Sequence, residues 1–451
     1  MSSAKPTDNR IASLDQFRGY TVAGMFLVNC LGSFAAVPYL WRHHNTFCSY
    51  ADTIMPQFFF AVGFAYRLTF GRRAQADGLS AAYWRAVKRF LGLALVAIVV
   101  YGSGNAARTW SELTEKGIGA LYDPIKSDWF QTLMHIAVTS LWILPVIRAG
   151  AGVRIAYLVG SAVLHAVLSQ WFYFEWIHAK PGCIDGGPLG FLTWSIPTLV
   201  GTLACDAIAG SEGRASKATL GKMIVWGVLL MLLGYGFSCG TRMYDIDKLP
   251  GETARTDDDA GRPIRDRNSK RAESPVIPPK EARDAWFASL RAGKWNEVLA
   301  EPPFTPPRFS RQDEQEQLGL KRYATTAYWL EPAQRNEKNE SALYRKENYW
   351  MMSQRAGSIS YLTFAAGLAL ILYVLFYELA DILGARVGVF RTLGVNALVG
   401  YILHGMVDRA VTAFMPRDSP GWYMFAGFAV YFFITWLFLR TLEKNRIFVK
   451  L

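Results

Sequence analysis

Two adjacent histidines, His43 and His44, precede Asp52 by a short stretch of chain, and this is the pattern in the sequence that most suggests catalysis. A carboxylate beside an imidazole fixes the tautomer of the ring and stabilises its protonated form, which suits a base that takes a proton from an amine or a hydroxyl. The same residues also fit a solvated loop in which Asp52 caps the helix that follows. Spacing alone leaves both interpretations open.

A charged cluster lies near the start of the chain, at Arg10, Asp15 and Arg18. Planar guanidinium groups bind phosphates through paired donors, so this cluster could hold the phosphorylated end of a cofactor. From the residues alone it fits better an ion pair that orients a helix as it enters a membrane. The sequence has neither a glycine-rich phosphate loop nor a cluster with the spacing of metal ligands, so we expect no metal.

Polar side chains also occur inside apolar segments, where they are costly unless they face protein or a polar cavity. Asn29 follows Arg18 by about three helical turns, so the two share one face of a helix. A second stripe, in which His404 can reach Asp408, recurs at intervals of one turn. Its members are Asn396, Gly400, His404 and Asp408. Hydrogen bonds between helices explain both stripes as well as catalysis does.

The elements that must position these residues are membrane helices. The chain has 451 residues, of which 51% are hydrophobic and 14% aromatic, and this is too apolar for a soluble enzyme of its size. The segment from Arg18 to Trp41 is long enough, at about 1.5 Å per residue, to cross a hydrocarbon core of about 30 Å. A helical hairpin over residues 10–67 would therefore place the charged cluster at one surface and the two histidines at the other.

Apolar segments along the chain predict an all-α polytopic membrane protein with about ten transmembrane helices. The segments are 18–41, 51–67, 90–104, 129–148, 154–176, 189–209, 223–240, 358–379, 393–415 and 423–439. Lys and Arg concentrate in alternate short loops, such as 67–89, which predicts that both termini are cytoplasmic. The N-terminal residues show no pattern of a cleaved signal peptide.

A charged, proline-rich insert over residues 241–348 separates the helices of 1–240 from those of 349–451. It is too polar to span a bilayer, so we expect an extracytoplasmic cap. Within it, residues 280–301 predict an amphipathic helix that lies on the membrane or over a cavity.

The net charge of +12 resides mainly in short loops rather than in a groove with interleaved aromatic side chains. This distribution favours anionic lipid as a partner and argues against nucleic acid. The five cysteines have no metal-site spacing and fit buried packing positions, with one disulfide at the outer face as an alternative. They are Cys30, Cys48, Cys183, Cys205 and Cys239.

Several stretches, taken in order, resemble the catalytic domain of heparan-α-glucosaminide N-acetyltransferase and its bacterial relatives. They are residues 10–19, Asn29, residues 51–63, 131–137, 185–190 with 196–197, 349–353 and 393–398. The loop over residues 42–50 departs from the family pattern, since it is shorter and lacks a Trp and a Gly. The family histidine therefore falls on either His43 or His44.

The resemblance implies an enzyme that takes acetyl-CoA at the cytoplasmic side and delivers the acetyl group to an extracytoplasmic sugar or glycan, such as an amino sugar. The catalytic residues would be His44, His43 and Asp52, with transfer either through an acetyl-histidine or directly. The residues assigned to the cofactor are Arg10, Asp15, Arg18, Asn29, Asn396 and His404. The expected location is the inner membrane of a bacterium, and a homodimer is one arrangement that the sequence allows.

Two other functions fit the same polar interior. A transporter or flippase for an anionic metabolite would use the polar track without chemistry. A catalytically silent relative would bind CoA and transfer nothing. Ligand specificity separates the enzyme from the transporter, because thermal stabilisation by CoA supports the enzyme, whereas stabilisation by an unrelated anion alone supports transport. The silent relative would bind CoA without any turnover.

Overall fold

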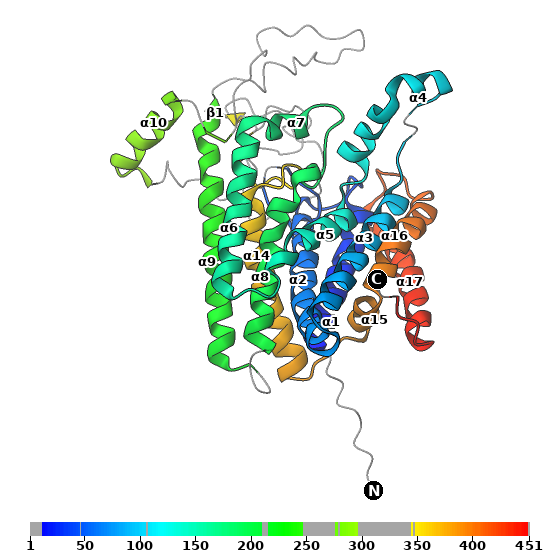
Figure 1. The fold of residues 1–451 in the computed structure, drawn as a ribbon. Coiled ribbons are helices and arrows are strands. Elements are labelled where there is room, and N and C mark those ends of the chain that lie inside the picture. Colours follow the sequence, from blue (N-terminus) through cyan, green and yellow to red (C-terminus); the bar gives the residue numbers. More distant parts are fainter. Residues whose placement is uncertain are drawn as a thin grey trace.

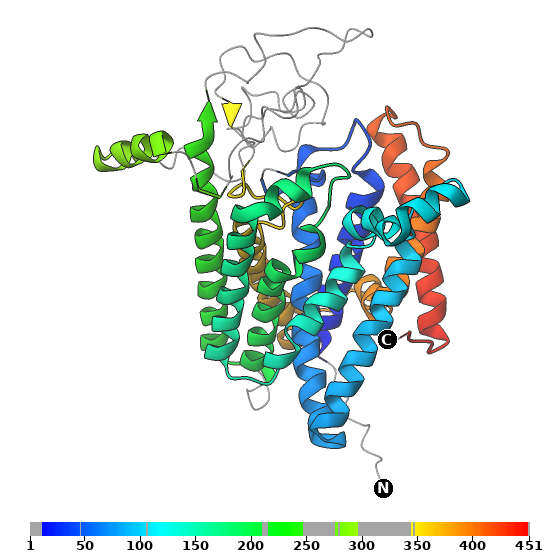
Figure 2. The same ribbon diagram turned by 45° about the horizontal axis from the view of Figure 1, so that its top comes forward.

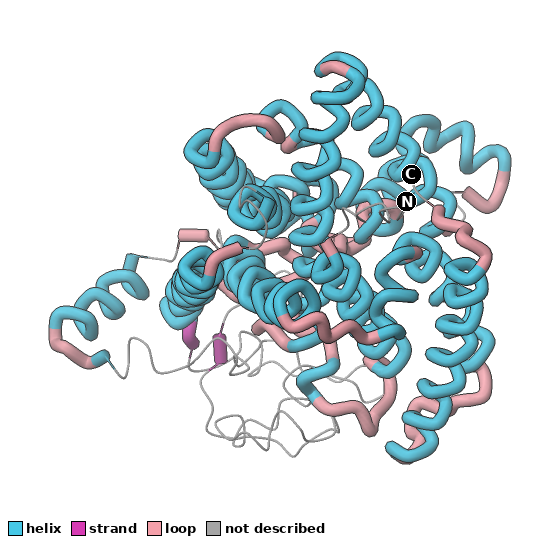
Figure 3. Tube along the Cα trace, turned by 90° about the horizontal axis from the view of Figure 1, so that it is seen from below, coloured by secondary structure: helices cyan, strands magenta, loops and turns pink. Residues whose placement is uncertain are grey.

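The computed structural model describes residues 11–45, 47–104, 107–209, 215–246, 276–277, 280–295, 344–345 and 348–449. This part of the chain is a bundle of helices, with one antiparallel pair of short strands, β1 (Asp245–Ile246) and β2 (Tyr344–Arg345). Arg10 and most of the predicted cap lie outside the described residues. A helix does begin at Lys280, as predicted, and this helix, α10 (Lys280–Arg291), stands apart from the bundle (Figures 1 and 3).

The first helix is displaced from its predicted position. Helix α1 (Ala12–Leu31) ends well before Trp41, and the chain continues through a turn and the short helix η1 (Tyr39–Trp41). Gly32 and Pro38 explain the difference, because glycine weakens a helix and proline disfavours helical backbone at the residue before it. Apolar character continues to Trp41, but the helix does not.

The basic stretch over residues 67–89 is helical rather than a loop. Helix α2 (Tyr50–Asp77) and helix α3 (Leu79–Tyr101) meet at Gly78, whose φ of 85° is one that glycine adopts without strain. Arg and Lys are good helix formers, so a helix can run past the end of its apolar segment. The prediction mistook the end of the apolar segment for the end of the helix.

The remaining predicted segments contain helices in the predicted order, with breaks at Ile143 inside 129–148 and at Asn396 inside 393–415, while α4 (Trp110–Lys116), η2 (Gly117–Leu121) and η3 (Pro124–Asp128) form in a stretch predicted as a loop. The helices that follow are α5 (Thr132–Trp142), η4 (Leu144–Val146), α6 (Ala151–Leu168), η5 (Ser169–Tyr173), α7 (Phe174–His178), η6 (Gly187–Leu189), α8 (Phe191–Ala209), α9 (Lys217–Cys239), η7 (Gly240–Tyr244), α14 (Ile359–Tyr377), η9 (Glu378–Ile382), α15 (Gly388–Val395), α16 (Ala397–Thr412) and α17 (Gly421–Lys444).

Five helical segments of the described residues are long and apolar enough to cross a membrane, and the helical architecture is compatible with a helical membrane protein. They are Ala151–His178, Gly187–Ala209, Lys217–Cys239, Ile359–Ile382 and Gly421–Lys444. On α9, side chains such as Trp226 and Leu232 point outward and are exposed, as lipid-facing residues are. The predicted number of ten spans stays a prediction.

The loop between α1 and α2 lies at the upper end of the bundle, and the turn between α2 and α3 lies at the lower end (Figures 1 and 2). Helix α2 therefore joins the two ends. All five cysteines lie in the described part of the chain, where each is buried and carries a free thiol.

Helix α2 packs directly against the backbone of α8 through glycines. A Cβ atom added at Gly63 would lie 1.9 Å from the carbonyl oxygen of Thr198, and one added at Gly201 would lie 2.1 Å from that of Phe60. Such close approach through small residues is how helices associate where there is no water to drive them together.

This packing predicts that Gly63→Ala destabilises the protein, by about 1–3 kcal/mol, because the new methyl group forces α2 away from α8. Gly71→Ala is the matched control on the same helix, where nothing lies within 4 Å. Alanine favours a helix more than glycine does, so the control should be neutral or stabilising. Thermal unfolding midpoints in detergent measure both effects, and equal midpoints for the wild type and Gly63→Ala would contradict the prediction.

Candidate functional site

The carboxylate of Asp52 connects the first loop to the start of α2. One oxygen, Oδ1, lies 3.0 Å from Nδ1 of His43. The other, Oδ2, accepts hydrogen bonds from the backbone amides of His44 (3.3 Å) and Ser49 (3.0 Å) and from the Ser49 hydroxyl (2.9 Å). Asp52 also completes a capping box with Ser49. Asp52 therefore orients His43 and caps helix α2 at the same time.

The structure separates the two histidines that the sequence left equivalent. The side chain of His43 is 45% accessible, so its ring reaches the surface of the protein. His44 is buried, and its ring stacks on Phe47 with centroids 4.1 Å apart. With Nδ1 held by Asp52, Nε2 is the remaining ring nitrogen of His43, and the side chain of Gln354 lies close to the ring.

Two further loops meet the histidine loop at this end of the bundle. Asp185, buried in the loop before α8, accepts a hydrogen bond from Nε2 of Gln354 at 2.7 Å. The amide of Gly186 donates to the carbonyl of Arg355 at 2.9 Å. The amide of Arg355 in turn donates to the side-chain oxygen of Asn45 at 3.4 Å. Residues 185–190 are among the stretches that carry the family resemblance, but no pattern in the sequence assigns a role to Asp185 or Gln354.

These contacts tune two titratable groups. Burial raises the pKa of Asp185 to about 6, and the hydrogen bond from Gln354 and the charge of His43 only partly oppose it. Burial lowers the pKa of His43, but the hydrogen bond to Asp52, together with the charges of Asp52 and Asp185, outweighs burial and leaves the pKa above its ordinary value. A base that titrates near the working pH is the most effective kind of proton acceptor.

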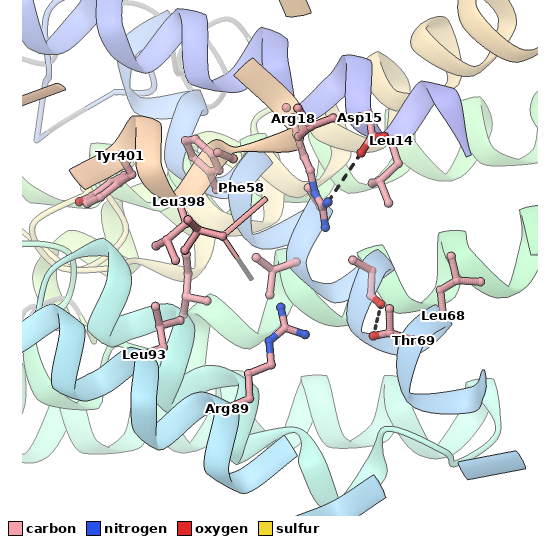
Figure 4. Close-up of a pocket in the computed structure, with 18 of the residues that line it drawn as sticks. Leu14, Asp15, Arg18, Phe58, Leu68, Thr69, Arg89, Leu93, Leu398 and Tyr401 are labelled. Atoms are coloured by element: carbon pink, nitrogen blue, oxygen red, sulfur yellow. Dashed lines mark hydrogen bonds and ion pairs between the residues drawn. The ribbon is translucent and has the colours of Figure 1, made fainter. Parts of the chain in front are cut away.

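A cavity of about 440 Å³ lies beside α2, towards the other end of the bundle. Its lining includes four arginines, Arg18, Arg72, Arg73 and Arg89, with Asp15 4.0 Å from Arg18. In Figure 4 the guanidinium groups of Arg18 on α1 and Arg89 on α3 point into the cavity from opposite sides. Such groups bind phosphates.

Apolar side chains line the rest of the cavity, such as Phe58, Leu93 and Leu398, and Tyr401 marks the end away from the arginines (Figure 4). The hydroxyl of Tyr401 lies 2.7 Å from that of Tyr101. This arrangement suits a long ligand with an anionic head and an apolar arm.

Comparisons with models of known protein families and with curated proteins give no match. The site is therefore interpreted from its own geometry. Within the described part of the chain, no group of three or more His, Cys, Asp or Glu side chains is placed to hold a metal ion.

The cavity stops short of the histidine. In the described residues its lining includes neither His43 and Asp52 nor Asn29 and His404. Two contacts connect these groups to its upper end. The ring of Tyr401 lies 5.4 Å from that of His404, and the hydroxyl of Thr132 lies 3.6 Å from the sulfur of Met55, one helical turn after Asp52.

Of four other predicted site residues, two line the cavity and two pair with each other outside its lining. Asn29 and His404 form a pair across α1 and α16, with Nδ2 and Nε2 3.2 Å apart. His404 does not reach Asp408 as expected, because Nδ1 lies against the carbonyl of Tyr401 one turn before it. Asp15 and Arg18 line the cavity.

Asn396 has a different neighbour from the one expected. Its amide donates to the carbonyl of Ile447 at 3.1 Å and accepts from the amide of Val449 at 3.3 Å. It thereby holds the C-terminal segment against the bundle, and Val449 itself lines the cavity. The contribution of Asn396 to the cavity is thus through this segment.

The raised pKa of Asp185 predicts how stability depends on pH. Between 3.8 and about 6 the folded protein keeps a proton on Asp185 that the unfolded chain has lost. The free energy of unfolding therefore falls as the pH rises through this window. We expect Asp185→Asn, which cannot titrate, to make the fall shallower, as measured by thermal unfolding at a series of pH values.

Asp418→Asn is the control, since Asp418 is an exposed aspartate. It should leave the pH dependence as it is in the wild type. If Asp185→Asn also leaves it unchanged, the carboxyl is not buried as described.

Proposed function

We propose that this protein is a membrane acyltransferase, which moves an acetyl or similar acyl group from acyl-CoA to the amine or hydroxyl of a sugar or glycan. One observation carries the proposal most directly. The same helix, α2, starts at the oriented His43–Asp52 pair and passes the arginine-lined cavity before it ends. A base for an acceptor and a site for an anionic donor are thus joined by one rigid element.

The distance along α2 fits transfer across a membrane. From Asp52 to Arg72 the helix rises about 30 Å at 1.5 Å per residue, which matches the thickness of a hydrocarbon core. Arg18, Arg72, Arg73 and Arg89 would take the phosphates of CoA, and the apolar walls would take its pantetheine arm. The thioester would then lie near Tyr401.

In this mechanism the acceptor binds at the exposed ring of His43. Nε2 takes a proton from the acceptor amine or hydroxyl while Asp52 holds Nδ1 and stabilises the imidazolium. The acceptor attacks the thioester carbonyl, the new bond to nitrogen or oxygen forms, and the carbon–sulfur bond breaks. The CoA thiolate leaves and takes the proton back from His43.

Asn29 is linked to the end of the cavity through His404, whose ring contacts that of Tyr401. In this mechanism the amide of Asn29 donates to the carbonyl oxygen of the thioester as negative charge develops there. His404 fixes the position of this amide. We assign the pair to positioning the donor, which keeps both residues on the cofactor side of the reaction.

The orientation follows from the charges at the lower end of the bundle. The parts of α2 and α3 on either side of Gly78 carry Arg72, Arg73, Arg85, Lys88 and Arg89, which favours the cytoplasmic side. We propose that α1 to α3, α5 and the α15–α16 pair also lie in the membrane, for about ten spans in all. The insert over 241–348 would then be extracytoplasmic, with both termini cytoplasmic in a bacterial inner membrane.

The proposal predicts that His43→Ala lowers acyl transfer by about 10²–10⁴-fold, the usual effect of losing a general base. His44→Ala is the matched control, and it should retain most of the activity if it folds. Release of the CoA thiol from acetyl-CoA, with glucosamine as acceptor probe, measures both. Equal activity of His43→Ala and the wild type, in a preparation that is active, would remove His43 from the mechanism.

A second prediction concerns the donor. Acetyl-CoA should raise the unfolding midpoint of the wild type, and Arg89→Gln should weaken this stabilisation about tenfold in concentration, because each charge-assisted hydrogen bond contributes about 1.5 kcal/mol or more. Arg386→Gln, an exposed arginine outside the cavity lining, is the control. Stabilisation by sulfate but not by CoA would favour transport of an anion instead.

A further inference from the structure

A second cavity, of about 490 Å³, lies between α2, α8 and the residues just before α6. It shares Leu68 and Arg72 with the lining of the first cavity, so the two are neighbours along α2. Its remaining lining is Arg67, Phe70, Gly71, Gln75, Arg148, Cys205, Asp206 and Ala209. None of these residues takes part in the acyl transfer proposed above.

The side of this cavity is built around a shared carboxylate. Arg67 donates to both oxygens of Asp206, with Nε at 2.7 Å and Nη2 at 3.1 Å. Arg154, which is almost fully buried, donates to Asp206 as well and to the hydroxyl of Thr202 at 2.8 Å. Two guanidinium groups thus share one carboxylate, so the cluster keeps a net positive charge.

The guanidinium group of Arg148 adds to this charge, and Arg72 is shared with the lining of the first cavity. Arg148 is exposed and forms no ion pair with the residues that the structure describes. The lining therefore carries three arginines and one aspartate, with Arg154 behind it. A concave site with this excess of guanidinium groups attracts an anion and repels a cation.

The position of the cavity indicates which kind of anion it binds. It opens at the same end of α2 as the basic turn to α3, where the polar surface of a membrane would lie. Basic pockets between helices at this depth bind phosphate groups. We propose that this second cavity binds a phosphate group, supplied either by the headgroup of an anionic lipid or by a free phosphate, at a site separate from that of the acyl donor.

The test uses the purified full-length chain in detergent and measures its thermal unfolding midpoint. The probes are inorganic phosphate, mixed micelles with phosphatidylglycerol, and mixed micelles with phosphatidylcholine. We expect phosphate or phosphatidylglycerol to raise the midpoint more than phosphatidylcholine does. Stabilisation by phosphatidylglycerol alone assigns the site to a lipid, whereas stabilisation by inorganic phosphate alone assigns it to a free anion.

Three variants locate the bound anion. Arg148→Gln should raise the concentration needed for stabilisation about tenfold, the loss of about one charge-assisted hydrogen bond. Arg89→Gln, which alters only the first cavity, and Arg386→Gln, which alters neither, should both behave as the wild type does. The proposal is overturned if no probe stabilises the protein, if Arg148→Gln responds as the wild type does, or if Arg89→Gln removes the effect. None of these results depends on whether the protein transfers an acyl group.

Discussion

The buried carboxylate of Asp52 is the interaction on which the described site depends. Only 1% of this residue is exposed, so its charge needs partners, and it finds them on both sides of the junction between loop and helix. Ser49 and the backbone of His44 use one oxygen, and His43 uses the other. Because one group both starts α2 and holds the imidazole, the position of His43 is fixed by the helix itself.

That coupling gives the rest of α2 its importance. The glycine contacts with α8 hold the helix against the bundle core, while its other face lines the cavity. At its lower part Arg67 ties it to α8 again through Asp206. A rigid helix with the His43–Asp52 pair at one end and the arginines of the cavity at the other keeps these two groups at a fixed distance. The proposed transfer between them would require this.

The sequence predicted the residues that depend on local spacing and missed those that depend on distant segments. The pairing of Asp52 with a preceding histidine follows from their short separation, and Asp15 and Arg18 line the cavity because both lie on α1. Gln354 could not be found in this way, since it reaches Asp185 only after the whole bundle has formed.

Two incomplete predictions have the same origin. The arginines around residue 72 were interpreted as a basic loop that sets topology, because composition shows charge and not which helix face carries it. Side chains four residues apart on a helix, such as His404 and Asp408, lie close together, but this spacing does not determine which group each one hydrogen-bonds. His404 faces the carbonyl of Tyr401 rather than Asp408, and Asn396 binds the C-terminal segment, which no periodic pattern connects to it.

The cavity ends before it reaches His43, at a pair of tyrosines. At the upper end of the cavity the hydroxyls of Tyr101 and Tyr401 bond to each other, and the amide of Leu133 donates to Tyr101 at 2.8 Å. Tyr401 also contacts the ring of His404, which pairs with Asn29 across α1 and α16. In the described residues the cavity lined by the arginines does not reach His43, so the proposed transfer requires a movement that joins them; without it the proposal fails.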